Sequence, residues 1–265
     1  MPNRIDQCFA KLRSEKQKGF IPYICAGDPD LDGTIRLSLA LETAGADVLE
    51  LGLPFSDPLA DGPVNQLASQ RALAAGATVP AVLSCVRAIR KESQIPIVLY
   101  TYLNPIFQFG LKKFHEEAAT AGVDGLLILD LPPEEDVDFA GDQIVHVRLI
   151  APTTPPERIA EIAGTAQGFI YYVSREGVTG AQKSVVSSLE SGVRQIRQFS
   201  GLPIAVGFGI STPEQARTVA QHADAVVIGS AIVSEVAKFG RDKDFVQRVI
   251  ETVEPLVEAI RSVSV

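Results

Sequence analysis

Eight short apolar segments alternate with helical segments along this chain of 265 residues, and the alternation predicts an α/β fold with an all-parallel sheet. A closed (β/α)8 barrel, or TIM barrel, needs about 250 residues, so this length favours a barrel over an open doubly wound sheet. A weak internal repeat supports it: residues 44–49 (AGADVL) recur as 121–126 (AGVDGL) and, more loosely, as 223–226 (ADAV). We predict one barrel domain, 1–265, with an extra N-terminal helix and additional helices.

In the first half of the chain, apolar side chains at helical spacing predict an N-terminal helix over 4–15. A helix over 31–44 is stopped by Gly45, and helices over 66–75 and 79–91 are separated at Gly76. The other elements are a helix over 111–121 and strands, each an apolar run ended by Gly, Pro or a polar residue, over 20–25, 48–51, 97–100 and 126–129.

In the second half, two helices carry start motifs. Thr154 and Glu157 are spaced as a capping box before 156–163, and Thr212 precedes Pro213 at the start of 213–221. The remaining helices are expected over 134–140, 185–199, 231–239 and 245–261, and the strands over 145–150, 169–173, 203–206 and 225–228.

Composition excludes several classes of protein. The formal net charge of −8 argues against a nucleic-acid surface, and no apolar run approaches the roughly 18 residues of a membrane helix. Residues 1–18 have no signal-peptide core, and the three cysteines form no Cys-x-x-Cys, which indicates reduced thiols in the cytoplasm or a plastid stroma. Three scattered histidines argue against a metal site.

The stretch 46–63 is organised around acids. Glu50 lies inside an apolar run, where a carboxylate is costly unless paired or neutralised. Asp57 and Asp61 follow in a rigid loop rich in Gly and Pro. Two carboxylates in different environments can have separated pKa values, which suits acid/base catalysis by Glu50 and Asp61. The alternatives are a structural, paired Glu50 and an Asp61 that only forms a turn; we interpret Asp57 and Asp130 as structural.

In a barrel the active site lies at the C-terminal ends of the strands. Gly207 and Gly209 follow the seventh strand, and Gly229 and Ser230 follow the eighth. Backbone amides there, next to helix N-termini, predict a phosphate site, although the glycines could also serve only tight turns. The loop 174–183, with Gly180, is expected to act as a lid rather than as a merely solvated loop. The tyrosines near strand ends are interpreted as pocket wall: Tyr23, Tyr100, Tyr102 and Tyr171.

The run 50–63 (ELGLPFSDPLADGP) resembles the signature of the tryptophan synthase α chain family. The resemblance covers essentially the whole chain, with further matches at 26–29, 104–105, 174–180, 207–210 and 229–233. It implies a carbon–carbon lyase of tryptophan biosynthesis, which cleaves indole-3-glycerol phosphate to indole and glyceraldehyde 3-phosphate by a retro-aldol reaction without a cofactor.

The resemblance also implies residue roles. Glu50 would protonate indole C3 and help to remove the glycerol hydroxyl proton, and Asp61 would accept a hydrogen bond from the indole N–H. The implied substrate contacts are Tyr23, Tyr100, Tyr102, Leu127, Tyr171, Thr179 and Phe208. The implied phosphate contacts are Gly180, Gly207, Gly209, Gly229 and Ser230.

A partner is implied as well: a tryptophan synthase β chain in an α2β2 heterotetramer, with pyridoxal phosphate only in the β chain. The loop 55–63 and the lid near Thr179 would carry the coupling. Three alternatives stay open: another phosphate-binding barrel of sugar-phosphate or tryptophan chemistry, a free-standing indole-3-glycerol phosphate lyase, and a non-catalytic subunit that binds a phosphate ligand and activates a β chain.

Overall fold

The structure, a computed structural model, describes residues 3–135, 144–173, 182–207 and 209–263. Within these residues nine parallel strands form one sheet in the order β5-β4-β3-β2-β1-β9-β8-β7-β6. The strands are β1 Gly19–Cys25, β2 Leu49–Gly52, β3 Ile97–Thr101, β4 Gly125–Ile128, β5 Val145–His146, β6 Arg148–Ile150, β7 Ile170–Val173, β8 Ile204–Gly207 and β9 Ala225–Ile228.

The predicted fifth strand is divided into β5 and β6. β5 pairs with β4, β6 pairs with β7, and Val147 between them still donates its backbone N–H to the carbonyl oxygen of Leu126 at 2.9 Å. The two ends of the sheet therefore belong to one kinked strand, and the barrel is nearly closed. The predicted (β/α)8 barrel is confirmed. The assignment of 1–265 to one domain stays a prediction.

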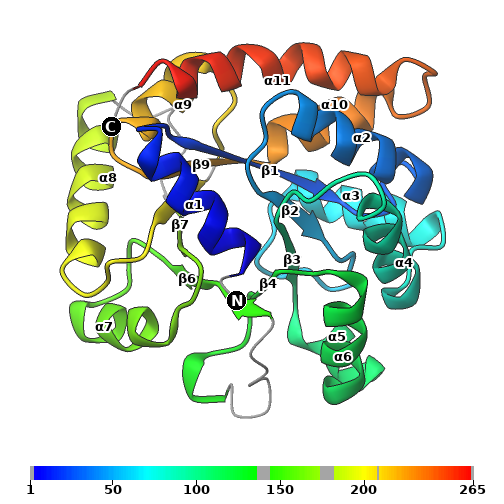
Figure 1. Cartoon of the computed structure of the whole chain (residues 1–265), viewed down its shortest axis with the longest axis horizontal. Coiled ribbons are helices and arrows are strands. Elements are labelled where there is room, and N and C mark those ends of the chain that lie inside the picture. Colours follow the sequence, from blue (N-terminus) through cyan, green and yellow to red (C-terminus); the bar gives the residue numbers. More distant parts are fainter. Residues whose placement is uncertain (1–2, 136–143, 174–181, 208, 264–265) are drawn as a thin grey trace.

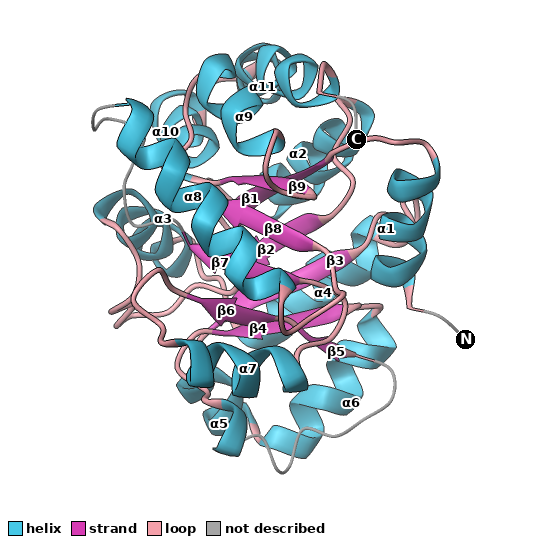
Figure 2. Cartoon of the chain, turned by 90° about the vertical axis from the view of Figure 1, so that its left-hand side faces the viewer, coloured by secondary structure: helices cyan, strands magenta, loops and turns pink. Residues whose placement is uncertain are grey.

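Helices surround this barrel (Figures 1 and 2). They are α1 Arg4–Ser14, α2 Leu31–Thr43, α3 Pro63–Ala74, α4 Val79–Ile89, α5 Leu103–Phe109, α6 Leu111–Ala121, α7 Pro156–Thr165, α8 Gln182–Arg197, α9 Pro213–Ala220, α10 Ser230–Phe239 and α11 Phe245–Arg261, with a 3-10 turn at Pro133–Glu135. The expected extra N-terminal helix, α1, buries Ile5, Phe9 and Leu12 against the side chains inside the barrel.

Several boundaries differ from the sequence predictions. α5 was not expected; the Asp130 carboxylate, from another loop, accepts the backbone N–H of Leu103 at 2.7 Å and so caps its first turn. The capping box at Thr154 is wrong, because the Thr154 hydroxyl accepts from the backbone N–H of Ala151 and Pro155 is the N-cap of α7. The Thr212 cap is confirmed, with Gln215 completing a capping box. The expected helix over 134–140 falls largely outside the described residues.

Four side chains fasten the strands in pairs at the N-terminal end of the barrel. Each side chain precedes the second strand of a pair and accepts a backbone N–H at the entry to the first. Asp47 accepts from Phe20 at 2.7 Å, Asp124 from Ile97 at 2.8 Å, Gln167 from His146 at 3.1 Å, and Asp224 from Ile204 at 2.8 Å. We call these side chains the strand clasps. The repeated sequence segments contain the three acidic clasps, which explains why these segments recur.

No single helix in the described parts of the chain is long and apolar enough to span a membrane. α3 and α4 reach the required length and composition only as a pair, and they are bent by 95° relative to each other.

Candidate active site

Side chains along each strand alternate between the barrel interior and the surrounding helices, and the interior positions form two layers. On β1, Phe20 and Ile24 face the helices, whereas Ile21 faces the barrel interior and Tyr23 comes two residues later on the same side. The same step of two residues leads from Val48 to Glu50. It recurs from Val98 to Tyr100, from Leu127 to Leu129, from Val147 to Leu149 and from Phe169 to Tyr171. The deeper layer is apolar, and the layer nearer the C-terminal ends carries the polar groups.

A cavity of about 480 Å³ opens at these C-terminal ends. Its walls come from strand ends and from the loops that follow them, as the barrel architecture predicts. The lining residues include Tyr23, Glu50, Asp61, Asn65, Tyr100, Leu129, Leu149, Tyr171, Gly209, Gly229 and Ser230. The structure thus brings together residues from β1, β2, β3, β7 and the last two βα loops.

Glu50 is a buried acid inside the barrel. Its side chain is 1% exposed, and its Oε1 atom has no hydrogen-bond partner in the described structure. Burial, and secondly the nearby Asp61 carboxylate, raise the pKa of Glu50 to about 8. Glu50 is therefore protonated in the free protein near neutral pH, and it can act as an acid first and as a base afterwards.

Asp61 lies in a different environment. The hydroxyl of Tyr102 donates to its Oδ2 at 2.8 Å, the hydroxyl of Tyr100 donates to its Oδ1 at 3.1 Å, and the Asn65 amide approaches Oδ1 at 3.5 Å. Burial raises the pKa of Asp61, and these three donors oppose that rise. The two acids differ because donors surround Asp61 and none reaches Oε1 of Glu50.

Four tyrosines lie in or beside the cavity, and two of them, Tyr100 and Tyr102, donate to Asp61. Burial, as the largest cause, raises the pKa of Tyr23, Tyr100, Tyr102 and Tyr171, so each phenol keeps its proton near neutral pH. Tyr102 also accepts the backbone N–H of Ala60 at 3.0 Å, which fastens the β2–α3 loop to the end of β3. Its hydroxyl contacts Asp61 although Tyr102 is not among the residues that line the cavity.

The predicted phosphate end of the cavity lies at the start of α10. Gly229 is the N-cap of α10 and makes no side-chain capping bond, whereas the start of α9 is closed by its capping box. The first N–H groups of α10 therefore lack a side-chain acceptor and can bind an anion. Gly207 is needed for close packing, because a Cβ there would lie 2.6 Å from the Tyr171 hydroxyl and 2.8 Å from the Val227 Cβ.

Some predicted residues lie elsewhere. Leu127 is in the apolar layer below the cavity, and Leu129, two residues further on, lines the cavity instead. Thr179, Gly180 and Phe208 lie outside the described residues. The sequence analysis missed Leu129, Leu149 and Asn65; the step of two along each strand indicates on which side the leucines lie, but not how deep in the barrel.

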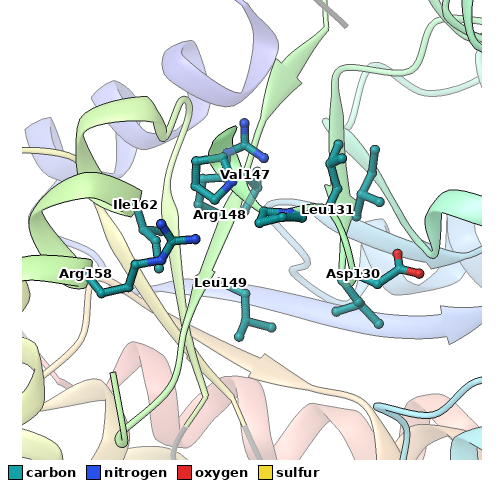
Figure 3. Close-up of a pocket in the computed structure, with 11 residues that line it drawn as sticks. Asp130, Leu131, Val147, Arg148, Leu149, Arg158 and Ile162 are labelled. Atoms are coloured by element: carbon teal, nitrogen blue, oxygen red, sulfur yellow. The ribbon is translucent and has the colours of Figure 1, made fainter. Parts of the chain in front are cut away.

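A second hollow of about 290 Å³ lies between β4, β6 and α7 (Figure 3). Two of its polar side chains already have partners: Asp130 caps α5, and Arg158 is paired with Glu134 and Glu161, each at 2.8 Å. Among the described residues, no cluster of three or more His, Cys, Asp or Glu side chains could hold a metal ion.

A nearly closed barrel with a cavity at the C-terminal ends of its strands, where a buried carboxyl group lies near a second acid, has the architecture of the (β/α)8-barrel enzymes. Comparison with known proteins is more specific. The sequence model of the family described as tryptophan synthase alpha chain matches residues 9–261, and the chain belongs to that family.

Relatives and solved structures agree. The chain is 51% identical to the tryptophan synthase alpha chain of Geotalea daltonii over 240 residues, which is 89% of this chain and 91% of the relative. The crystal structure of tryptophan synthase subunit alpha from Legionella pneumophila is similar with a TM-score of 0.91 and 39% identity, covering 99% of this chain and 100% of that one. A chain of the tryptophan synthase α2β2 complex from Pyrococcus furiosus matches with a TM-score of 0.84 and 38% identity, covering 92% of this chain and 99% of that one.

Proposed function

We propose that this chain is the α subunit of a tryptophan synthase and cleaves indole-3-glycerol phosphate to indole and glyceraldehyde 3-phosphate. One observation carries the proposal: the buried carboxyl group of Glu50, without a partner at Oε1, faces the cavity beside Asp61. A protonated carboxyl group in that position is what protonation of a carbon atom requires.

The proposed reaction uses the two acids in sequence. Protonated Glu50 gives its proton to C3 of the indole ring, which makes the ring a cation. Asp61 stays ionised and accepts a hydrogen bond from the ring N–H, so it stabilises that cation. The hydroxyl group on the adjacent glycerol carbon then loses its proton to the Glu50 carboxylate. A carbonyl group forms there, and the electrons of the broken C–C bond return to the ring.

The phosphate group of the substrate is placed at the start of α10. The described donors are the first N–H groups of α10 after Gly229 and the Ser230 side chain, and Gly209 lines the same cavity. Gly207, and beyond the described residues Gly180, complete the proposed phosphate contacts. The indole ring occupies the end lined by Tyr23, Tyr100, Leu129 and Tyr171, and Thr179 and Phe208 are proposed to close it.

The proposed partner is a tryptophan synthase β chain in an α2β2 assembly. Leu59, in the loop that carries Asp61, is 91% exposed, and Phe107 on α5 is 61% exposed. Large exposed apolar side chains beside a cavity suit a protein interface. This chain needs no cofactor for the proposed reaction, and pyridoxal phosphate is assigned to the β chain. We place the assembly in the cytoplasm.

The decisive assay gives the purified chain indole-3-glycerol phosphate and measures indole, with and without a tryptophan synthase β chain. We expect indole in both cases and faster release with the β chain. A rate that no β chain changes would favour a free-standing lyase. Stimulation of a β chain without any indole from this chain would favour the non-catalytic activator.

A further inference from the structure

Tyr100 lines the cavity, and its hydroxyl group also donates a hydrogen bond to the acid Asp61. It lies on β3, and its OH donates to Asp61 Oδ1 at 3.1 Å. Its ring packs edge-on against Tyr23, with centroids 5.0 Å apart and an interplanar angle of 69°, so the hydroxyl is held in place.

Tyr100 and Tyr102 are two residues apart, so both face Asp61 from the same end of β3. They occupy different oxygens of one carboxylate, Oδ1 and Oδ2. Two donors on two oxygens fix both the position and the rotation of a carboxylate. The Tyr102 hydroxyl also accepts the backbone N–H of Ala60, whereas the Tyr100 hydroxyl hydrogen-bonds to Asp61 alone among the described residues.

Neutral hydrogen-bond donors, not cations, hold the Asp61 carboxylate within the described structure. Glu50 faces it from β2, Tyr23 and Cys25 from β1, Tyr171 from β7, Tyr100 and Tyr102 from the end of β3, and Asn65 from α3. None of the groups that shift the pKa of Asp61 in the described structure is a cation. Two buried carboxyl groups so close together disfavour being ionised at the same time. One of the pair Glu50 and Asp61 therefore keeps a proton, and the surroundings decide which one.

We propose that Tyr100 is a positioning residue that acts through Asp61: its hydroxyl holds the Asp61 carboxylate ionised and oriented toward the indole N–H, so that the single shared proton resides on Glu50. This inference rests on the proposed function and adds to it a division of labour between the two acids. Tyr100 makes no bond to the reacting atoms itself.

Tyr100→Phe tests the inference because it removes one hydroxyl group and keeps the ring. We expect kcat for indole formation to fall about tenfold, with KM for indole-3-glycerol phosphate nearly unchanged. The acidic limb of the pH profile moves upward by about one unit, because Asp61 loses a donor and binds its proton more readily. Unchanged kcat with a raised KM would overturn the inference and make Tyr100 a substrate contact.

Tyr172→Phe is the matched control. Tyr172, on β7, is buried, and its hydroxyl points outward against Gly192 of α8. The control loses the same group away from the cavity, and we expect neither kcat nor the pH profile to change. Equal effects in the two variants would show a general loss of barrel packing and overturn the inference.

A double-mutant cycle tests whether Tyr100 acts through Asp61. In the Asp61→Ala background, Tyr100→Phe should change the rate by less than about twofold, since the group it positions is gone. A further tenfold loss in that background would overturn the inference.

Failure of the proposed function can be separated from failure of this inference. Absence of indole from the unmodified chain, with and without a β chain, would refute the lyase but not the arrangement of the acids. The pKa of Asp61, followed by carboxyl ¹³C NMR in the unmodified chain and in Tyr100→Phe, needs no turnover. A rise of about one unit supports the inference, and an unchanged pKa overturns it.

Discussion

Buried acidic residues lie at both ends of this barrel, but their surroundings differ. At the N-terminal end, the clasp Asp124 is buried, bonded to the Ile97 N–H at 2.8 Å, and paired with Arg90 at 2.7 Å and Arg4 at 2.8 Å. At the C-terminal end, Glu50 is equally buried, but its Oε1 atom has no partner in the described structure.

The difference shows what makes a buried acid reactive. Arginines and backbone donors satisfy the three acidic clasps: besides the pairs of Asp124, Arg261 pairs with Asp47 at 2.9 Å and Arg197 with Asp224 at 3.1 Å. Such an acid joins two strands through its hydrogen bonds and ion pair and strengthens the fold. An acid left with burial and a second acid beside it can take up and release a proton near neutral pH. The following predictions test this contrast, from the largest expected effect to the smallest.

Glu50→Gln should have the largest effect. Removing the proton donor while keeping the volume is expected to lower kcat for indole formation about a thousandfold, or roughly 4 kcal/mol of barrier. The measurement is indole release from indole-3-glycerol phosphate, with circular dichroism to verify that the fold is kept. Normal turnover would show that Glu50 is only structural.

Asp124→Asn should leave the chemistry intact and weaken the fold. Arg90 would stay buried without its counter-charge, so we expect a loss of about 3 kcal/mol of unfolding free energy. Urea denaturation measures it, and the rate per folded molecule should not change. Asp32→Asn, which breaks the exposed pair with Arg36, is the matched control with an expected loss below about 0.5 kcal/mol. Equal losses in both variants would contradict the contrast.

Asp61→Ala is expected to reduce kcat about a hundredfold, or roughly 2.7 kcal/mol, because the cationic ring loses its stabilising carboxylate. Affinity for glycerol 3-phosphate, measured by calorimetry, should stay within about twofold of that of the unmodified chain, since the phosphate end is built from other elements. A large loss of this affinity would assign Asp61 to the scaffold of the loop.

The last prediction concerns pH and stability. The pKa of Glu50 is raised from 4.5 to about 8 on folding, so the folded state binds more protons between these values. Glu50 therefore destabilises the fold progressively as pH rises through that window. Between pH 5 and 8, the free energy of unfolding of Glu50→Gln should rise by about 2 kcal/mol relative to that of the unmodified chain. This is less than the full pKa shift of Glu50 implies, because the cavity admits water. Parallel stability curves would contradict this.

Much of this architecture could be predicted because it depends on patterns within short stretches of the sequence. Apolar runs, glycine stops and the Thr212 cap indicated the strands and most helices. α5 could not be predicted, since Asp130 caps it from a segment distant in sequence. The kink at Val147 is also a tertiary feature, because the strand must pair with β4 at one end and with β7 at the other.

For the site, the sequence identified the acids and the glycine ends of the last two strands. It could not show that Tyr100 and Tyr102 share Asp61, because that depends on how a loop folds back over a strand. Nor could it decide between Leu127 and Leu129, since depth in a barrel depends on strand stagger, while alternation gives only the side.

The strand clasps divide the ring into four repeated quarters, each made of two successive strands. Three quarters are fastened by a carboxylate that is also paired with arginine, and the fourth, around the kinked strand, is fastened by the neutral amide of Gln167. We therefore expect thermal opening of the ring to begin in the quarter held by Gln167, whose backbone amide hydrogens should exchange first, whereas Glu50 lies in the opposite quarter, which Asp47 and Arg261 fasten.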